Sequence, residues 1–174
     1  KLGRFQHTEE LNQAIRKYRL DELPSGVARY RGCAAIGEEV YLMRDYCLGS
    51  SLADLRANGQ VFGSRDVVGI LRGVTGLLSK VRLPHGSLSS SNVFVAEDSQ
   101  VSLGDWLIGS LAGLTAKYDG ILKEELEQRR LSNPYITCSN TLLPAEERDA
   151  YSLGVVSCEL LGADVTSFPA RSEE

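Results

Sequence analysis

The chain has 174 residues, of which 43% are hydrophobic and 24% charged; this predicts a globular domain with a buried core and excludes a disordered tail. Its formal net charge of -4 at pH 7 leaves no basic excess to neutralise phosphates, so we expect no nucleic-acid partner. No apolar run approaches the roughly 18 residues that would suggest a membrane span, so we expect none.

Three elements are predicted in the first 46 residues. Residues 8–18 carry apolar side chains at helical spacing, which predicts a helix with Thr8 as its N-cap. The sequence LPSG at 23–26 then ends that helix. Residues 27–37 and 38–46 are rich in Val, Tyr and alternating side chains, which predicts two strands joined as a hairpin at Gly37.

Helices and strands are also predicted in the rest of the chain. A short helix over SLADLRAN should end at Gly59, and Ser64 should cap a longer helix. That helix has one apolar stripe, formed by Val67, Ile70, Leu71, Val74, Leu77 and Leu78. The strands NVFVA and VSL follow, then a charged helical piece at 123–130. The segment AYSLGVVSCELLG predicts a helix that is apolar nearly all round and therefore buried.

The cysteines bear on the compartment in which the protein works. Cys33, Cys47, Cys138 and Cys158 are far apart and form no C-x-x-C pair, so we expect no zinc site. We expect free thiols instead and, with them, a cytoplasmic or other reducing compartment. The chain begins without Met and ends just after an apolar helix, so we expect it to be a segment of a longer protein.

One stretch, LPHGSLSSSNVFVAEDSQVSLGDW at 83–106, carries a motif. The spacing of His85, Asn92 and Asp105 resembles the H-R-D-L-x-x-x-N loop and the D-F-G motif of protein kinases. The resemblance implies an α+β protein kinase-like fold. Residues 1–46 would be a partial small lobe, with the family's αC helix and last two strands. Residues 47–174 would be the first part of the helical large lobe, from αD to αF.

The resemblance also implies that the catalytic groups are replaced. Ser87 stands where the family has the Asp that accepts the substrate's proton, and Ser carries no carboxylate. Ser89 stands where a Lys often lies near the transferred phosphate, and Gly86 where an Arg binds a phosphorylated loop. Leu107 replaces the D-F-G glycine, and we expect that it cannot take the glycine-only backbone angles of that position. We therefore predict no catalytic residue here.

Other positions keep the family's structural residues. His85 and Trp106 stand where kinases stack a His and an aromatic ring beneath αC. Asp149 stands where an Asp ties αF to the catalytic loop. This combination is typical of a pseudokinase, a kinase fold used as a scaffold or allosteric module. The subfamily stays open, because different fragments resemble rhoptry-type kinases, receptor-like kinase-homology modules and TBC-containing kinase-like proteins.

Two retained residues favour an alternative, a nucleotide-binding or weakly active kinase. The resemblance implies that Asn92 and Asp105 would hold the Mg²⁺ ions that bridge the phosphates of ATP. Other nucleotide contacts look absent, because the chain has no G-x-G-x-x-G sequence and Lys1 is the only candidate for the phosphate-binding Lys. Either no cofactor binds and these two residues only hold the loop and cap a turn, or ATP binds with Mg²⁺.

The alignment of the small lobe leaves two positions open. The glutamate of αC could be Glu9 or Glu10, although the middle of the helix offers Gln13 and Ala14. The gatekeeper position, at the back of the adenine pocket, holds Arg44 or, after a slip of one residue, Met43. An unpaired guanidinium would be costly to bury there and would obstruct a purine.

The leading prediction is a catalytically inactive pseudokinase that acts through protein contacts. The resemblance does not include the family's last helices, so apolar surface over residues 153–161 would be uncovered. We expect a protein partner or the remainder of a longer chain to cover it.

Overall fold

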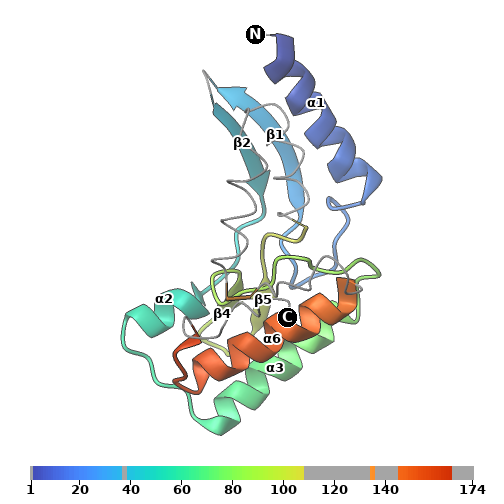
Figure 1. Ribbon diagram of the computed structural model, residues 1–174. Helices are drawn as coiled ribbons and strands as arrows, with labels where there is room; N and C mark the ends of the chain where they lie inside the picture. Colours follow the sequence, from blue (N-terminus) through green and yellow to red (C-terminus); the bar gives the residue numbers. More distant parts are fainter. Residues whose placement is uncertain (1, 37–38, 108–133, 136–144, 166–174) are drawn as a thin grey trace, which may run out of the picture.

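The computed structural model describes residues 2–36, 39–107, 134–135 and 145–165; Lys1, Cys138 and the charged piece at 123–130 lie outside these ranges. The described elements are α1 (Leu2–Lys17), β1 (Tyr30–Ile36), β2 (Glu39–Arg44), β3 (Ser50–Ser51), α2 (Leu52–Ala57), α3 (Ser64–Leu78), β4 (Val93–Val95), β5 (Val101–Leu103) and α6 (Ala145–Leu160). Figure 1 shows α1, β1 and β2 at one end and the remaining elements at the other. No helix within the described ranges is long and apolar enough to cross a membrane.

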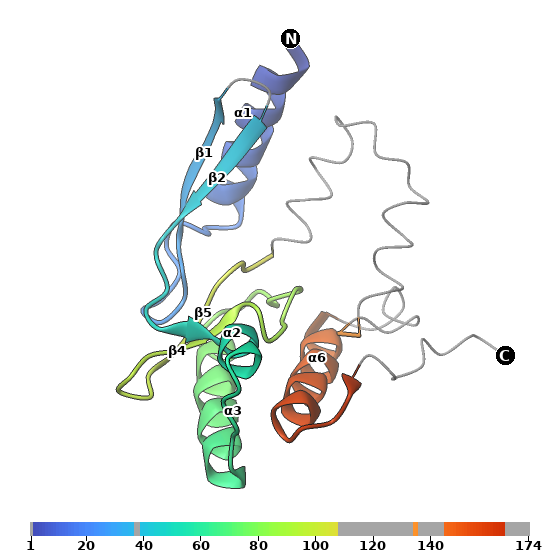
Figure 2. The ribbon, with the colours of Figure 1, turned by 90° about the vertical axis from the view of Figure 1, so that its left-hand side faces the viewer.

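Helix α1 packs along strand β1 (Figure 2). Its apolar residues Leu11, Ala14 and Ile15 are buried. The Asn12 side chain accepts a hydrogen bond from the Cys33 N–H at 3.0 Å and donates one to the Cys33 carbonyl at 3.4 Å. The edge of β1 that is not paired with β2 exposes backbone donors and acceptors. At Cys33 the Asn12 side-chain amide bonds to these groups as a neighbouring strand would.

Two predicted helix caps are wrong. Helix α1 begins at Leu2, so Thr8 lies within it, and no proline precedes Thr8 to stop the helix. Helix α3 begins at Ser64 and its N-cap is Gly63, whose N–H donates to the Asp66 carboxylate at 2.9 Å. The Asp66 carboxylate, in the first turn, satisfies the free N–H group of Gly63. The Ser64 hydroxyl, which the sequence predicts as the cap, is therefore not needed.

Strands β1 and β2 form the predicted antiparallel hairpin, in which Tyr30 lies opposite Arg44. The register shifts between Tyr30 and Gly32, which marks a bulge. A bulge bends its strand and re-aims the neighbouring side chains. Here Tyr30 is fully buried, and its hydroxyl donates a hydrogen bond to the Trp106 carbonyl at 3.1 Å. This bond joins the hairpin to the segment that follows β5.

The second sheet has the strand order β3-β4-β5 and is antiparallel throughout. Helix α3 packs against β5 through the apolar stripe predicted for it. In this stripe Val67, Ile70, Val74 and Leu77 are buried, and Leu71 and Leu78 are partly buried. The stripe, the hairpin and α1 contribute to one core, which therefore spans both ends of the described structure.

Two glycines of α3 should respond in opposite ways to replacement by Ala. A Cβ on Gly73 would lie 2.7 Å from the Val101 side chain, whereas nothing lies within 4 Å of a Cβ on Gly76. Ala is favoured over Gly in helices, so Gly76→Ala should stabilise the protein by about 0.5–1 kcal/mol. Gly73→Ala should destabilise it by about 1–2 kcal/mol, because overpacking outweighs that gain. Urea denaturation measures both, and a stabilised Gly73→Ala would contradict the close approach of α3 to β5.

Helix α6 packs against α3 and buries Val155, Val156 and Leu160. The expectation that this segment is buried nearly all round holds for one side only. Leu161, just after the helix, is 61% exposed, and Gly154 is also exposed. The physical reason is that α3 covers a single face of α6 within the described residues.

Candidate functional site

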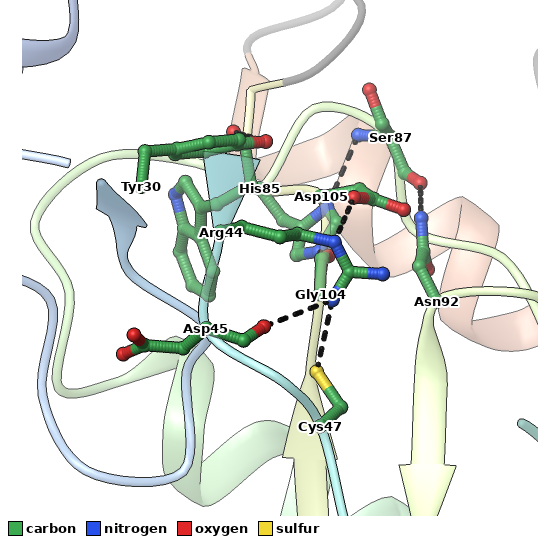
Figure 3. Close-up of polar contacts among 10 residues, drawn as sticks. Tyr30, Arg44, Asp45, Cys47, His85, Ser87, Asn92, Gly104 and Asp105 are labelled. Carbon is green, nitrogen blue, oxygen red and sulfur yellow. Dashed lines mark hydrogen bonds and ion pairs between the residues drawn. The ribbon is translucent and has the colours of Figure 1, made fainter. Parts of the chain in front are cut away.

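The motif residues meet where the loop before β4 approaches the turn after β5 (Figure 3). Two backbone hydrogen bonds join these segments: Gly104 N–H donates to the Asn92 carbonyl at 2.9 Å, and Leu107 N–H donates to the His85 carbonyl at 2.8 Å. Strands β4 and β5 pair with each other, so they hold the loop and the turn in register.

His85 lies fully buried between the loop and the turn. The Ser87 N–H donates to Nδ1 at 3.3 Å, so the ring proton lies on Nε2, which donates to the Gly104 carbonyl at 2.9 Å. The ring packs on Trp106 with centroids 4.8 Å apart. Burial lowers the pKa of His85 to about 4, so the imidazole is neutral near neutral pH.

His85 should make the protein lose stability as the pH falls. The His85 pKa is about 4 in the folded protein, against an ordinary value of 6.5, so between these values the unfolded chain binds more protons. The contribution of neutral His85 to the free energy of unfolding should therefore be fully present above about pH 6.5. It should fall by about 3 kcal/mol as the pH approaches 4. Urea denaturation across this range, compared with His85→Gln, isolates the contribution. The same pH dependence in both proteins would show that His85 does not titrate this way.

Asp149 holds the loop to α6. Its Oδ2 accepts a hydrogen bond from the His85 N–H at 2.6 Å, and its Oδ1 accepts one from the Gly86 N–H at 2.8 Å. The carboxylate is buried. Gly86 takes a positive φ of 72°, a conformation that glycine adopts readily, and this lets two successive N–H groups point at one carboxylate.

Asn92 closes the same loop from within. Its side-chain oxygen accepts a hydrogen bond from the Ser89 N–H at 2.8 Å, and its side-chain nitrogen donates to the Ser87 carbonyl. Asn92 is buried. Ser87 and Ser89 thus supply backbone groups to this arrangement.

Asp105 forms an ion pair with Arg44 from the end of β2. The Arg44 Nε lies 2.9 Å from the Asp105 Oδ1, and Nη1 lies 3.3 Å from the Cys47 sulfur (Figure 3). The guanidinium also lies over the Phe94 ring, 5.7 Å from its centroid. An unpaired guanidinium would be costly to bury at this position, but Arg44 is paired with Asp105. Met43 is 47% exposed, so it is Arg44 that reaches the motif residues.

Leu107 has a positive φ in a region that favours glycine but is open to other residues, so its conformation does not test the expectation about glycine-only angles. Leu107 has φ 55° and Asp105 has φ 58°, both in the left-handed region. That region is narrow for residues with a Cβ but allowed, at a cost of about 1–2 kcal/mol. Burial of the Leu107 side chain and its N–H bond to His85 offset this cost.

The residues present do not fit the ATP and Mg²⁺ that the kinase resemblance implies. The Asn92 side-chain oxygen accepts from the Ser89 N–H, and the Asp105 Oδ1 pairs with Arg44. No group of three or more His, Cys, Asp and Glu side chains in the described part of the chain could hold a metal ion. Lys1 lies outside the described ranges, so its predicted role stays a prediction.

The sequence reasoning missed a network around Tyr135. Its hydroxyl lies 2.8 Å from the Ser90 hydroxyl and donates to the Glu159 carboxylate, which pairs with Arg56. The Ser152 hydroxyl donates to the Tyr135 carbonyl at 2.9 Å. Burial, followed by the Glu159 carboxylate, raises the pKa of Tyr135 to about 12. The sequence did contain a signal for this network: Glu159 is a charged residue within the apolar sequence of α6. A buried carboxylate needs hydrogen-bond or charged partners.

Comparison with known proteins relates the chain distantly to a protein kinase. No protein-family model matches the chain. The serine/threonine-protein kinase TAO1-A of Xenopus laevis is 26% identical to it over 140 residues, which is 75% of this chain and 13% of that kinase. The chain thus spans a small part of the length of that relative. The mixed helices and small sheets described above are compatible with part of a kinase-like fold, and the similarity supports a distant kinase-like relationship.

Proposed function

We propose that this chain is a kinase-related module that acts through protein contacts and transfers no phosphate. The observation that supports this most is the use of the loop's polar side chains. His85, Asn92 and Asp149 direct their side-chain nitrogens and oxygens at backbone groups of the loop and the adjoining turn. Side-chain groups that already hydrogen-bond to the backbone are not free to bind a substrate or to accept its proton.

A general base is the group that phosphate transfer to a hydroxyl would need in this loop. Ser87 has no carboxylate. Two nearby carboxylates have other partners: Asp149, on α6, accepts from the His85 and Gly86 N–H groups, and Asp105 pairs with Arg44. This distribution of partners favours a motif without catalytic function over one that transfers phosphate.

The contacts that we propose involve the end of α6. The sequence predicted uncovered apolar surface over residues 153–161, but Val155, Val156 and Leu160 are already buried, so Leu161, 61% exposed, is the apolar side chain that remains for a protein partner or the remainder of a longer chain to cover. The net charge of -4 makes a nucleic-acid partner unfavourable. We also propose a reducing compartment, because Cys33, Cys47 and Cys158 are free thiols.

Phosphate transfer gives the decisive test. The chain is incubated with radiolabelled ATP, Mg²⁺ or Mn²⁺ and a mixture of protein substrates, beside Asp105→Ala. We expect the same background incorporation from both proteins. Incorporation by the natural chain that Asp105→Ala abolishes would instead support the second candidate, a weakly active kinase. That candidate rests on Asn92 and Asp105, and the Asp105 side chain keeps 33% exposure.

The contact surface can be tested separately with a dye that binds exposed apolar surface. We expect Leu161→Asp to reduce dye binding more than Val61→Asp, a matched change at a residue 85% exposed in a different part of the chain. Equal dye binding by the two variants would count against residues 153–161 as the contact surface.

A further inference from the structure

The described elements contact one another in two groups. Helix α1 packs on β1, which pairs with β2; in the other group α2 and α3 pack on the second sheet, and α6 packs on α3. Within the described ranges, no element of one group packs extensively against an element of the other. Figures 1 and 2 show the two groups at opposite ends of the molecule. The few contacts that join the groups therefore decide how a movement at one end reaches the other.

Two side chains of the hairpin reach the turn at residues 104–107. The Arg44 Nε lies 2.9 Å from the Asp105 Oδ1 (Figure 3). The Tyr30 hydroxyl donates a hydrogen bond to the Trp106 carbonyl at 3.1 Å, and burial raises the pKa of Tyr30, so the hydroxyl keeps this proton. Arg44 lies opposite Tyr30 in the hairpin, and their partners are neighbours in the turn. We call these two interactions the hairpin–turn contacts.

Three further residues fix where the Arg44 guanidinium lies. Its Nη1 is 3.3 Å from the Cys47 sulfur, and the Phe94 ring provides a cation–π contact at 5.7 Å. A Cβ at Gly104 would lie 3.1 Å from both the Arg44 Nη1 and the Phe94 ring, so the lack of a side chain there makes room for the guanidinium. The Arg44 and Asp105 side chains keep 29% and 33% exposure, so dissolved salt can weaken their ion pair.

The turn has a backbone conformation that is unfavourable for its residues. Asp105 has φ 58° and Leu107 has φ 55°, in the left-handed region that costs energy for a residue with a Cβ. The turn also holds the loop before β4, because the Gly104 and Leu107 N–H groups donate to carbonyls of that loop at 2.9 and 2.8 Å. A backbone of this kind persists only where surrounding contacts hold it. The hairpin–turn contacts act on the two residues between Gly104 and Leu107.

We propose that the hairpin–turn contacts couple the position of the hairpin to the turn at 104–107 and, through it, to the loop before β4. While both contacts are made, the turn keeps its left-handed residues and its bonds to the loop. When they break, the turn relaxes and releases the loop. A partner that displaces the hairpin would therefore also act on the loop. This inference goes beyond the proposed function, since it concerns movement within the chain and not what the chain contacts.

The test follows hydrogen exchange of individual backbone amides by NMR. The amides of Gly104 and Leu107 report opening of the turn, and amides in the interior of α3 report unfolding of the whole chain. Arg44→Met removes the charge and keeps an apolar stem over Phe94. Tyr30→Phe removes the hydroxyl alone and provides a second variant if Arg44→Met does not fold.

Each variant has a matched control. Arg29→Met also removes a guanidinium, just before β1, but Asp45, the partner of Arg29 at 2.9 Å, keeps Arg31 as a second partner. Tyr46→Phe removes the hydroxyl of a tyrosine that is 82% exposed. Neither control removes a hairpin–turn contact.

We expect the Gly104 and Leu107 amides to exchange at least roughly tenfold faster in Arg44→Met and in Tyr30→Phe than in the natural chain. Amides of α3 and both control variants should stay within about twofold of the natural chain. Raising NaCl from about 0.05 to about 1 M should speed exchange of the same two amides in the natural chain, because salt screens the ion pair. This salt effect should be absent from Arg44→Met.

Three results would overturn the inference. Unchanged exchange of both turn amides in the two variants would mean that the hairpin does not hold the turn. Equal acceleration in the turn and in α3 would mean that Arg44 and Tyr30 contribute only to overall stability. A salt effect of the same size in Arg44→Met would mean that it does not come from this ion pair. The proposed function is tested separately, by phosphate transfer and by dye binding.

Discussion

Asp149→Ala is expected to lower the free energy of unfolding by about 3–5 kcal/mol. The carboxylate accepts hydrogen bonds from the His85 and Gly86 N–H groups, at 2.6 and 2.8 Å. Ala would leave a buried N–H group without its acceptor and would release the loop from α6. Urea denaturation followed by the fluorescence of Trp106, the single Trp of the chain, measures the loss.

Two further variants calibrate the loss expected at Asp149. Asp149→Asn keeps one acceptor oxygen, so we expect it to lose about half as much stability as the Ala variant. Asp98→Ala is the control, because Asp98 accepts a hydrogen bond from the Gln100 N–H at 3.0 Å in an exposed turn. It should change stability by about 0.5 kcal/mol or less. An Asp149→Ala loss as small as that of Asp98→Ala would mean that the loop does not depend on α6.

Trp106→Ala should cost about 3–5 kcal/mol of stability. Trp106 is fully buried, packs on the His85 ring and belongs to the core shared by α1, the hairpin and α3. Its removal would leave a cavity between the two ends of the described structure. Urea denaturation followed by circular dichroism measures the loss, because this variant has no Trp fluorescence.

Trp106→Phe should cost clearly less than Trp106→Ala. The Trp106 Nε1 is buried and has no hydrogen-bond partner among the described residues, and an unsatisfied donor costs about 1–3 kcal/mol. Phe removes that donor and keeps an aromatic ring beside His85, so part of the lost packing is offset. Leu161→Ala, at an exposed residue, serves as control. Equal losses for the Phe and Ala variants would indicate that the indole donor does have a partner.

Local sequence patterns were sufficient for the hairpin, for α3 and for the strands β4 and β5. Each depends on neighbours within a few residues: alternation on either side of Gly37, or an apolar stripe at helical spacing. The helix caps depend on single interactions, and there the predictions at Thr8 and Ser64 were wrong. One acceptor such as Asp66 is enough to change where a helix begins.

The motif spacing also placed His85, Asn92 and Asp105 in one neighbourhood, because β4 and β5 pair directly and bring their flanking residues together. Spacing could not show what these side chains contact. The Asn92 amide could have faced a metal, and the backbone angles of Leu107 depend on its burial as well as on its type.

The main helices and strands and the acidic charge of the chain thus follow from the sequence alone. The pairing of Arg44 with Asp105 and the link from Ser90 through Tyr135 to Glu159 could be seen only in the folded protein. The physical reason is that each of these contacts joins residues far apart in the chain. Such a contact forms only when packing has fixed both backbones, whereas helical and strand patterns act between neighbours before any packing exists.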